Sequence, residues 1–316
     1  MAVAFVARRL GAGLISLAIL SAIIFACTHV LPGDAATAIL GEGATPEALA
    51  ALRTQLGLDR SLPAQFLGWL GGIPVGAFGT STTLNQPAGA IIAERFGNSL
   101  ALAATTLAVA TALAIPLGVA AAAHRGSRLD GSILAASYVG IAIPDFVVAP
   151  LLIVFLASPP LGFLPSSGFV PPTASVGGWL AHMVLPVLVL TSLLTAHLLR
   201  QTRSGMLEVL ASDYVRTARL KGLPERVVLW RHALRNGLTT TITVVALDVG
   251  YLMGSIVIVE EIFAYPGLGR LIVYAVANRD MPLVQGTALV IGAVYVVANV
   301  LADLAHAALN PRVARP

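Results

Sequence analysis

Six long apolar stretches constrain this chain more than any other feature of its sequence. A helix needs about 20 apolar residues to cross the hydrocarbon core of a bilayer, which is roughly 30 Å thick. No water in that core can bind backbone N–H and C=O groups, so such a stretch must be helical. The sequence therefore predicts an all-α polytopic membrane protein with six transmembrane helices. The expected spans are residues 10–30, 99–123, 132–157, 179–199, 238–259 and 284–304.

Composition supports a membrane location and argues against several soluble classes. Charged residues make up 11% of the chain, against about 25% in soluble domains. The net charge of +4 could suggest a nucleic-acid partner, but no soluble basic domain is visible, so we expect no nucleic acid. The single cysteine, Cys27, excludes an internal disulfide and a multi-cysteine metal site, and we expect no metal or other cofactor. A signal peptide at the start is the weaker alternative, because the remaining chain is itself strongly hydrophobic.

Positive charge is distributed unevenly over the connections between the spans. Six spans place both chain ends on one face, together with residues 124–131 and 200–236. This face carries 14 of the 19 Lys and Arg residues, and residues 200–236 alone carry 8. Because cytoplasmic connections are enriched in Lys and Arg, both termini are predicted to be cytoplasmic.

This topology divides the chain into three regions. Residues 1–30 form the N-terminal cytoplasmic end and the first span, and residues 31–98 form an extracytoplasmic segment. Residues 99–316 form a core of five spans that includes the loop 200–236. The extracytoplasmic segment is too long for a bare connection, so we expect short helices in it.

Two short helices are predicted within residues 31–98. In "TPEALAALRTQLG", Thr45 is a candidate N-cap, Pro46 occupies the first helical position and Gly57 follows the last. A second amphipathic helix is expected at residues 63–70.

The most basic stretch, residues 213–236, carries six Lys or Arg residues. Asp213 is a candidate N-cap for a helix that stops at Gly222, and Pro224 then begins a second helix. Two short helices at the membrane base would make a docking platform. The alternative is that the charge only orients the protein in the membrane.

Several motifs of this chain resemble the membrane-spanning permease subunits of binding-protein-dependent ABC importers, specifically the dipeptide/oligopeptide (peptide/nickel) branch. "DYVRTARLKGL" and "HALRN" in the basic loop are similar to that branch's form of the family's "EAA" motif, in which a small residue precedes a glycine by four positions. Here these residues are Ala218 and Gly222, whereas Arg216 and Thr217 replace the first two letters. Further resemblances, in chain order, are "VARRL", "LPGD" (31–34), "GAFGTS" (76–81, with Ala77 in place of an acidic residue), "VEEIFAYPGLGRL" (259–271) and "ALNPRV" (308–313).

The resemblance implies a type I ABC importer permease fold with an extracytoplasmic insertion after the first span. The basic loop between the fourth and fifth spans would then be the coupling helix, which fits a groove on a cytoplasmic ATPase. Ala218 would let the helix approach its partner closely, Gly222 would permit a left-handed helix end, and the cationic side chains would pair with acidic groups at the groove rim. The candidate docking residues are Asp213, Tyr214, Arg216, Thr217, Ala218, Arg219, Lys221 and Gly222.

The resemblance also implies the location and the partners. It implies a multi-pass protein of the bacterial cytoplasmic (inner) membrane. Its partners would be a second permease subunit, expected to be a different chain, P-loop ATPase subunits, a solute-binding protein and membrane lipid. The cargo would be short peptides, with nickel or glutathione as alternatives within the branch.

The chain itself is not expected to be an enzyme. A phosphate-binding P-loop requires Gly-x-x-x-x-Gly-Lys-Ser/Thr. The only lysine, Lys221, is followed by Gly222 and Leu223, so ATP hydrolysis is expected on partner subunits.

Ionisable and small residues inside the spans are candidates for the translocation pathway or for helix contacts. Asp145 follows Pro144 in the third span and could instead satisfy backbone groups released by the proline. Asp248 lies deep in the fifth span, beside the small-xxx-small pair Gly250 and Gly254. That pair favours a helix interface, within this chain or with a second permease.

The loop from residue 260 to residue 282 is predicted to break the helix because of its prolines and glycines. With segment 31–98 it could receive the binding protein. The candidates that would face this protein are Glu260, Glu261, Pro266 and Gly267, although the two glutamates could also be ordinary solvated loop residues.

Two rival functions come from other classes. An intramembrane aspartyl protease would need Asp145 and Asp248 to share a proton, but neither lies in the Tyr-Asp or Gly-x-Gly-Asp context of such enzymes. A secondary transporter or channel would not need the cytoplasmic platform, and no similarity between the two halves of the chain indicates inverted repeats.

Overall fold

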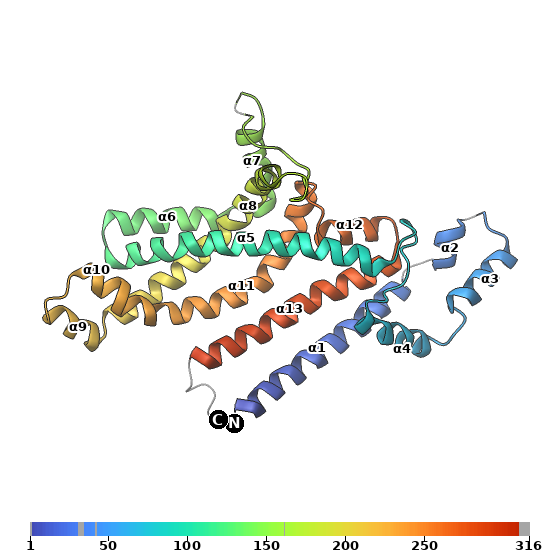
Figure 1. Cartoon of the computed structure of the whole chain (residues 1–316), viewed down its shortest axis with the longest axis horizontal. Helices are drawn as coiled ribbons and strands as arrows, with labels where there is room; N and C mark the ends of the chain where they lie inside the picture. The colour runs from blue at the N-terminus through green and yellow to red at the C-terminus, as the bar shows by residue number, and fades with distance from the viewer. Residues whose placement is uncertain (1, 31–34, 42, 161, 310–316) are drawn as a thin grey trace. The chain divides into compact units, whose positions relative to one another are not determined.

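The computed structural model describes residues 2–30, 35–41, 43–160 and 162–309. The regular elements of these residues are helices, and no β-strand longer than an isolated bridge is present among them (Figure 1). They divide into two compact units. Unit 1 comprises residues 101–265 together with two end segments, residues 1–9 and 297–316. Unit 2 comprises residues 10–100 and 266–296. The motifs "LPGD" at 31–34 and most of "ALNPRV" at 308–313 lie outside the described residues.

Five of the six predicted apolar stretches each lie within one continuous helix. These helices are α1 (Ala2–Val30), α5 (Ala88–Ala123), α8 (Val176–Leu210), α11 (Leu234–Ile262) and α13 (Met281–Leu309). Within the described residues, α1, α5, α8 and α13 are long and apolar enough to cross a membrane, and a fifth crossing is counted if one bent pair is a single span. The 29 residues of α11 make it about 44 Å long, which also exceeds the hydrocarbon thickness. Helix α5 begins eleven residues before the predicted stretch and α8 ends eleven residues after it, because hydropathy detects only the membrane portion of a helix.

The third predicted stretch, 132–157, is not one helix, and the prediction of a continuous span is wrong there. Helix α6 (Arg128–Ala142) is followed by α7 (Asp145–Leu152) and a π-helix, η2 (Ile153–Ala157), and the two parts are bent by 100°. Pro144 cannot donate a helical hydrogen bond and holds Ile143 in an extended conformation. Helix α6 alone is about 22 Å long, too short to cross the bilayer.

Unit 2 contains the predicted short helices. Helix α3 (Pro46–Leu56) begins after Thr45, whose hydroxyl accepts the Ala48 N–H, and ends at Gly57 with φ +69°. Helix α4 (Leu62–Gly72) covers the second predicted helix. Helix α2 (Ala35–Leu40), the 3₁₀ turn η1 (Ile73–Val75) and α12 (Leu268–Ala277) were not anticipated.

Helices α1 and α13 pack against each other in unit 2 in opposite directions. A methyl group added at Gly292 of α13 would fall on the Leu20 side chain of α1, so the glycine permits close approach. Eight residues further along α1, the hydroxyl of Thr28 accepts a 2.7 Å hydrogen bond from the Gln285 amide. A buried cluster from the start of α5, α12 and the start of α13 forms the apolar core of this unit: Ala88, Ile91, Ile92, Leu268, Leu271, Ala275 and Leu283.

Helix α8 is the central element of unit 1 and packs against α6, α7 and α11. Its contact with α11 is close because Gly205 and Gly237 face each other. A Cβ atom at Gly205 would lie 2.5 Å from the carbonyl oxygen of Gly237. The hydroxyls of Thr202 and Thr241 are 3.1 Å apart in the same interface.

The glycine contact between α8 and α11 leads to a stability prediction. Gly205→Ala forces its methyl group into the Gly237 backbone and should destabilise the subunit by about 1–3 kcal/mol, the usual cost of overpacking. Thermal unfolding of the purified protein in detergent measures the effect. Gly254→Ala is the matched control. A Cβ there meets no atom of the described residues within 4 Å, so this variant should leave the melting temperature unchanged or higher. Equal melting temperatures for the two variants would contradict the packing described.

Candidate functional site

Helix α9 (Asp213–Leu220) forms the predicted platform and has one buried and one exposed face. Val215 and Ala218 are buried in a cluster with Val119 and Ala122 of α5 and Met206 of α8, among others. Ala218 is only 7% exposed. Its expected role in close approach to a partner is therefore corrected: this small side chain lets α9 pack against the chain's own helices.

The ends of α9 agree in part with the prediction. Ser212, in an extended conformation, occupies the N-cap position, so the prediction of Asp213 as the cap is wrong by one residue. Asp213 lies in the first turn, where its carboxylate is favourable near the positive end of the helix dipole. Gly222 has φ +75°, which confirms the predicted left-handed end, and its N–H donates to the Arg219 carbonyl at 2.9 Å.

The second helix of the loop begins after Pro224, as predicted, but it does not end as a separate short helix. Helix α10 (Glu225–Val227) passes into a π-helix, η3 (Val228–Ala233), and then directly into α11. The platform is therefore continuous with the long helix that covers the fifth predicted span.

Two side-chain contacts tie α9 to this continuous helix. Arg219 donates to both carboxylate oxygens of Glu225, at 2.6 and 3.2 Å, and Asn236 donates to the hydroxyl of Tyr214 at 2.8 Å. The Arg219 guanidinium lowers the pKa of Glu225 through these hydrogen bonds. Arg219 was predicted to pair with a partner's acidic groups, but its carboxylate partner in the structure belongs to the chain itself.

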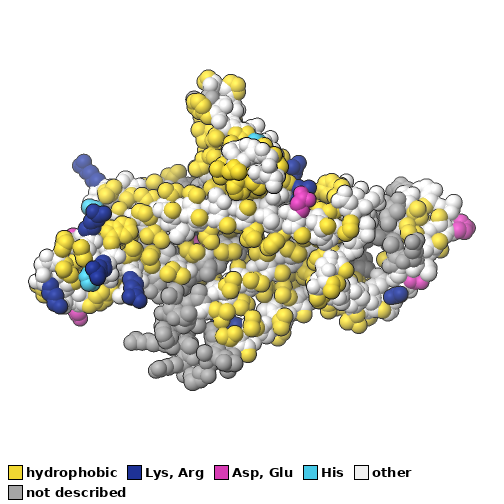
Figure 2. Space-filling model, in the orientation of Figure 1, with side chains coloured by type: hydrophobic (Ala, Val, Ile, Leu, Met, Phe, Trp, Pro, Cys, Tyr) yellow, Lys and Arg dark blue, Asp and Glu magenta, His cyan; other side chains and the backbone are white. Residues whose placement is uncertain are grey.

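The outward face of α9 carries positive charge and one apolar side chain. Arg216, Thr217 and Lys221 are exposed, and Figure 2 shows Lys and Arg side chains gathered over the α9 and α10 end of unit 1. Leu220 is 79% exposed at the tip of the helix. Sequence analysis missed Leu220, although its position two residues after Ala218 places it off the buried face of a helix.

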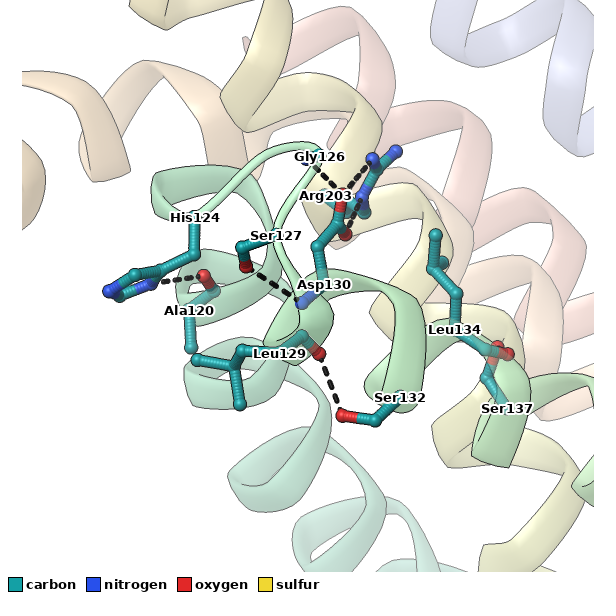
Figure 3. Close-up of polar contacts among 10 residues, drawn as sticks. All are labelled: Ala120, His124, Gly126, Ser127, Leu129, Asp130, Ser132, Leu134, Ser137 and Arg203. Carbon is teal, nitrogen blue, oxygen red and sulfur yellow. Dashed lines mark hydrogen bonds and ion pairs between the residues drawn. The ribbon is translucent and has the colours of Figure 1, made fainter.

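A second polar contact anchors the same end of the unit. Arg203 of α8 donates from Nε and Nη2 to the two carboxylate oxygens of Asp130, both at 2.8 Å (Figure 3). Asp130 also accepts the Gly126 N–H, and the Ser127 hydroxyl caps α6 by accepting the Asp130 N–H. This bidentate pair holds the α5–α6 turn against α8. In the sequence, Arg203 contributed only to the count of Lys and Arg on one membrane face. Its pairing with Asp130 was not predicted, because the two residues are 73 positions apart.

Asp248 and Asp145, the two candidate pathway carboxylates, lie in different surroundings. Asp248 of α11 is 5% exposed, and Nδ1 of His197 on α8 lies 2.9 Å from its Oδ1. Asp145, in the first turn of α7, lies near the hydroxyl of Ser255. Each carboxylate thus has its own partner. The partner of Asp248, His197, belongs to α8 and lies 51 residues away in the sequence.

A cavity of about 240 Å³ opens beside the His197–Asp248 pair. Arg200 and Tyr251 also line it, together with apolar residues of α6 and α8. The two glycines of the small-xxx-small pair differ, because Gly250 is buried whereas Gly254 is exposed. A Cβ atom at Gly254 would meet no atom within 4 Å in the described part of the chain.

The candidates for contact with a binding protein separate into buried and accessible residues. Glu260 is 0% exposed and lies within α11, so its expected exposure on a loop is wrong. Burial raises the pKa of the neighbouring Tyr265 to about 12, and the Glu260 charge adds to this. Glu261 is exposed.

In unit 2, Pro266 and Gly267 line a cavity of about 220 Å³ with Arg95 and Tyr274. The Asn98 amide donates to the Pro266 carbonyl at 2.8 Å, which fixes the turn before α12. This turn confirms the predicted helix break after residue 260.

Comparison with known proteins decides the class to which this arrangement belongs. The sequence profile described as "binding-protein-dependent transport system inner membrane component" matches residues 114–315, and the profile of the corresponding N-terminal region matches residues 2–104. The chain belongs to this permease family. It is 40% identical to a putative peptide transport system permease protein of Brucella melitensis, with 99% of each chain covered. It is 36% identical to the dipeptide transport system permease protein of Escherichia coli, with 98% of each chain covered.

The "GAFGTS" motif of this permease contributes to a carboxylate site in unit 2 that sequence analysis missed. Asp280, fully buried, accepts hydrogen bonds from the hydroxyls of Ser81 and Thr83 and from the Thr83 N–H. The Leu283 N–H donates to its other oxygen. Burial raises the pKa of the Asp280 carboxyl, but the hydrogen bonds from Ser81 and Thr83 outweigh it and hold the pKa below its usual value. This cage fixes the strand-like segment before α5 to the turn before α13.

The Asp280 cage predicts how stability depends on pH. The folded pKa lies below the ordinary value of about 3.9, so the stabilisation is present above that pH and is lost as the pH falls through the folded pKa. Asp280→Asn should lose about 1–3 kcal/mol at neutral pH, because the donors lose a charged acceptor. Its melting temperature should also fall less between pH 6 and pH 3 than that of the unmodified protein. The exposed Asp59→Asn is the control and should keep the unmodified pH profile. If the melting temperature of Asp280→Asn fell between pH 6 and pH 3 by as much as that of the unmodified protein, the Asp280 cage would not be the source of the pH dependence.

Proposed function

We propose that this permease forms part of the translocation pathway of an ATP-driven importer of short peptides, which a solute-binding protein delivers. The names of its relatives support the peptide cargo, since the proteins of Brucella melitensis and Escherichia coli are both described as peptide or dipeptide transport permeases. Nickel or glutathione remains the alternative cargo of the same branch.

The proposed membrane arrangement has six crossings in the type I importer fold, with the bent pair α6–α7 as the third crossing. Both termini are placed in the bacterial cytoplasm. An ion pair between Arg9 of α1 and Asp303 of α13, 2.6 Å apart, supports this placement, because it holds the first and last helices together near the two chain ends. The Lys and Arg distribution supports the cytoplasmic side.

The observation that carries the proposal is the construction of the α9 platform. Its outward face is cationic and carries exposed Leu220, while its inner face is packed on α5 and α8 and bonded to α10 and α11. Such a helix can pass a displacement to the membrane helices because it cannot move independently of them. We assign its outer face to a cytoplasmic P-loop ATPase, which supplies the hydrolysis for which this chain has no P-loop motif.

Two further partners follow from the same arrangement. We assign Glu261, Pro266, Gly267 and segment 31–98 to the extracytoplasmic side, where the binding protein docks. Gly254 is exposed, and a Cβ there would meet no atom of the described chain within 4 Å, so we assign it to the contact with a second permease subunit, which we expect to be a different chain.

The rival functions have less support. An aspartyl protease needs two carboxylates that share one proton, whereas Asp145 lies near Ser255 and Asp248 is bonded to His197. A secondary transporter has no use for a docking platform. Copurification separates the classes, since an importer subunit should bring a P-loop ATPase with it and the rivals should not.

Leu220 gives the sharpest test of docking. Leu220 is an exposed apolar side chain at the end of a cationic helix and is suited to fill a pocket of the ATPase. A few buried side chains carry most of the energy of an interface. Leu220→Ala should weaken binding-protein-stimulated ATPase activity in proteoliposomes about tenfold, a loss of about 1.4 kcal/mol. Leu220→Met preserves apolar volume and should retain most of the activity. Unchanged stimulation in Leu220→Ala would place the docking surface elsewhere.

Gly222 tests the helix end separately. A β-branched residue resists φ +75°, so Gly222→Val should insert in the membrane but lose coupling of ATP hydrolysis to transport. Among the described residues, no atom lies within 4 Å of the added Cβ, so we expect the effect to come from the backbone. Gly222→Asn is the control, because asparagine tolerates the left-handed conformation and should retain coupling. If Gly222→Val and Gly222→Asn coupled ATP hydrolysis to transport equally well, the left-handed helix end would not be needed for coupling.

A further inference from the structure

The cavity beside His197 and Asp248 contains a cation without a carboxylate partner. Arg200 lines the cavity and, within the described part of the chain, no acidic side chain forms an ion pair with it. Asp248 lines the same cavity but is bonded to His197 through both oxygens, at 2.9 and 3.2 Å. The guanidinium of Arg200 lies 5.8 Å from the ring centre of Tyr138, an aromatic contact that orients the side chain.

The position of this cavity argues against a lipid environment. Its lining comes from α6, α8 and α11, and His197 lies within the apolar stretch 179–199 of α8. The His197 side chain is 41% exposed and Tyr251 is also exposed. Ionisable side chains at membrane depth face a helix interface or a water-filled path, because lipid tails cannot solvate them. The open side of the cavity therefore faces a path or a protein partner.

The chemistry of the cavity selects an anionic, planar group. A guanidinium binds a carboxylate through two parallel hydrogen bonds, and Arg200 lies at the cytoplasmic end of the apolar stretch 179–199. A peptide with a free C-terminus carries one such group. The volume of about 240 Å³ accommodates a terminal residue and not a folded chain.

We propose that Arg200, oriented by Tyr138 and set beside the His197–Asp248 pair, is a subsite for the terminal carboxylate of the peptide during translocation. The proposal rests on peptide import as the function of this permease. Helices α8 and α11 carry the subsite, and the same two helices carry the α9 platform between them. A displacement of α9 would therefore move the two helices that bind the carboxylate of the peptide.

The test measures import by the complete complex, with binding protein, both permeases and ATPases, in proteoliposomes. The probes are trialanine and trialanine amide, which differ only in the carboxylate. The binding protein contributes equally to all variants, so a change in the ratio of acid to amide import between variants belongs to the permease. Arg200→Gln should lower trialanine import about tenfold, the effect of losing one hydrogen bond to a charged group, and change amide import less than about twofold.

Matched variants make the outcome specific. Arg200→Lys keeps the charge without the planar fork and should give an intermediate ratio of acid to amide import. If the Arg200→Gln complex fails to assemble, Arg200→Lys replaces it as the test variant. Arg128→Gln removes an exposed cation that does not line the cavity and should keep the unmodified ratio. An unchanged ratio in both Arg200 variants overturns the subsite, including the case in which Arg200 binds only a lipid phosphate. A complex that imports neither probe before mutation overturns peptide import itself, and the subsite with it.

Discussion

The absence of water from the hydrocarbon core determines most of this structure. A polar group there finds its best partners within the protein, and three pairs of buried or half-buried polar side chains fix contacts between particular helices. Gln285 and Thr28 join α13 to α1, Thr202 and Thr241 join α8 to α11, and His197 and Asp248 join the same two helices at a second level. Apolar packing alone would leave the rotation of such helices weakly defined, because lipid is as apolar as leucine.

Sequence was sufficient for elements whose signal is local. The apolar stretches located five continuous helices, and Thr45, Pro46 and Gly57 defined the ends of α3 because caps act over three or four residues. The left-handed residue Gly222 was predictable for the same reason. Boundaries outside the apolar stretches were not, since α5 and α8 each continue for about three turns beyond the membrane portion.

Contacts between distant residues could not be predicted from one sequence. Asp130 and Arg203, or Ser81 and Asp280, are ordinary surface residue types whose pairing depends on the fold. The same limitation explains why Ala218 and Glu260 were placed on the surface: a small residue beside a basic stretch and a carboxylate beside a loop both suit exposure. Their burial depends on helices far away in the chain.

The bent pair α6–α7, with its angle of 100°, determines whether the number of membrane crossings is even or odd. If the bent pair crosses the membrane, residues 124–131 and 200–236 share one face with both chain ends. If it turns back, α8 carries the eight cations of residues 200–236 to the face opposite Arg125 and Arg128, and the two ends of the chain separate. Charge asymmetry between the faces would then be weakened. The break at Pro144 therefore affects which membrane face each later connection reaches, because it interrupts the helix within the third apolar stretch.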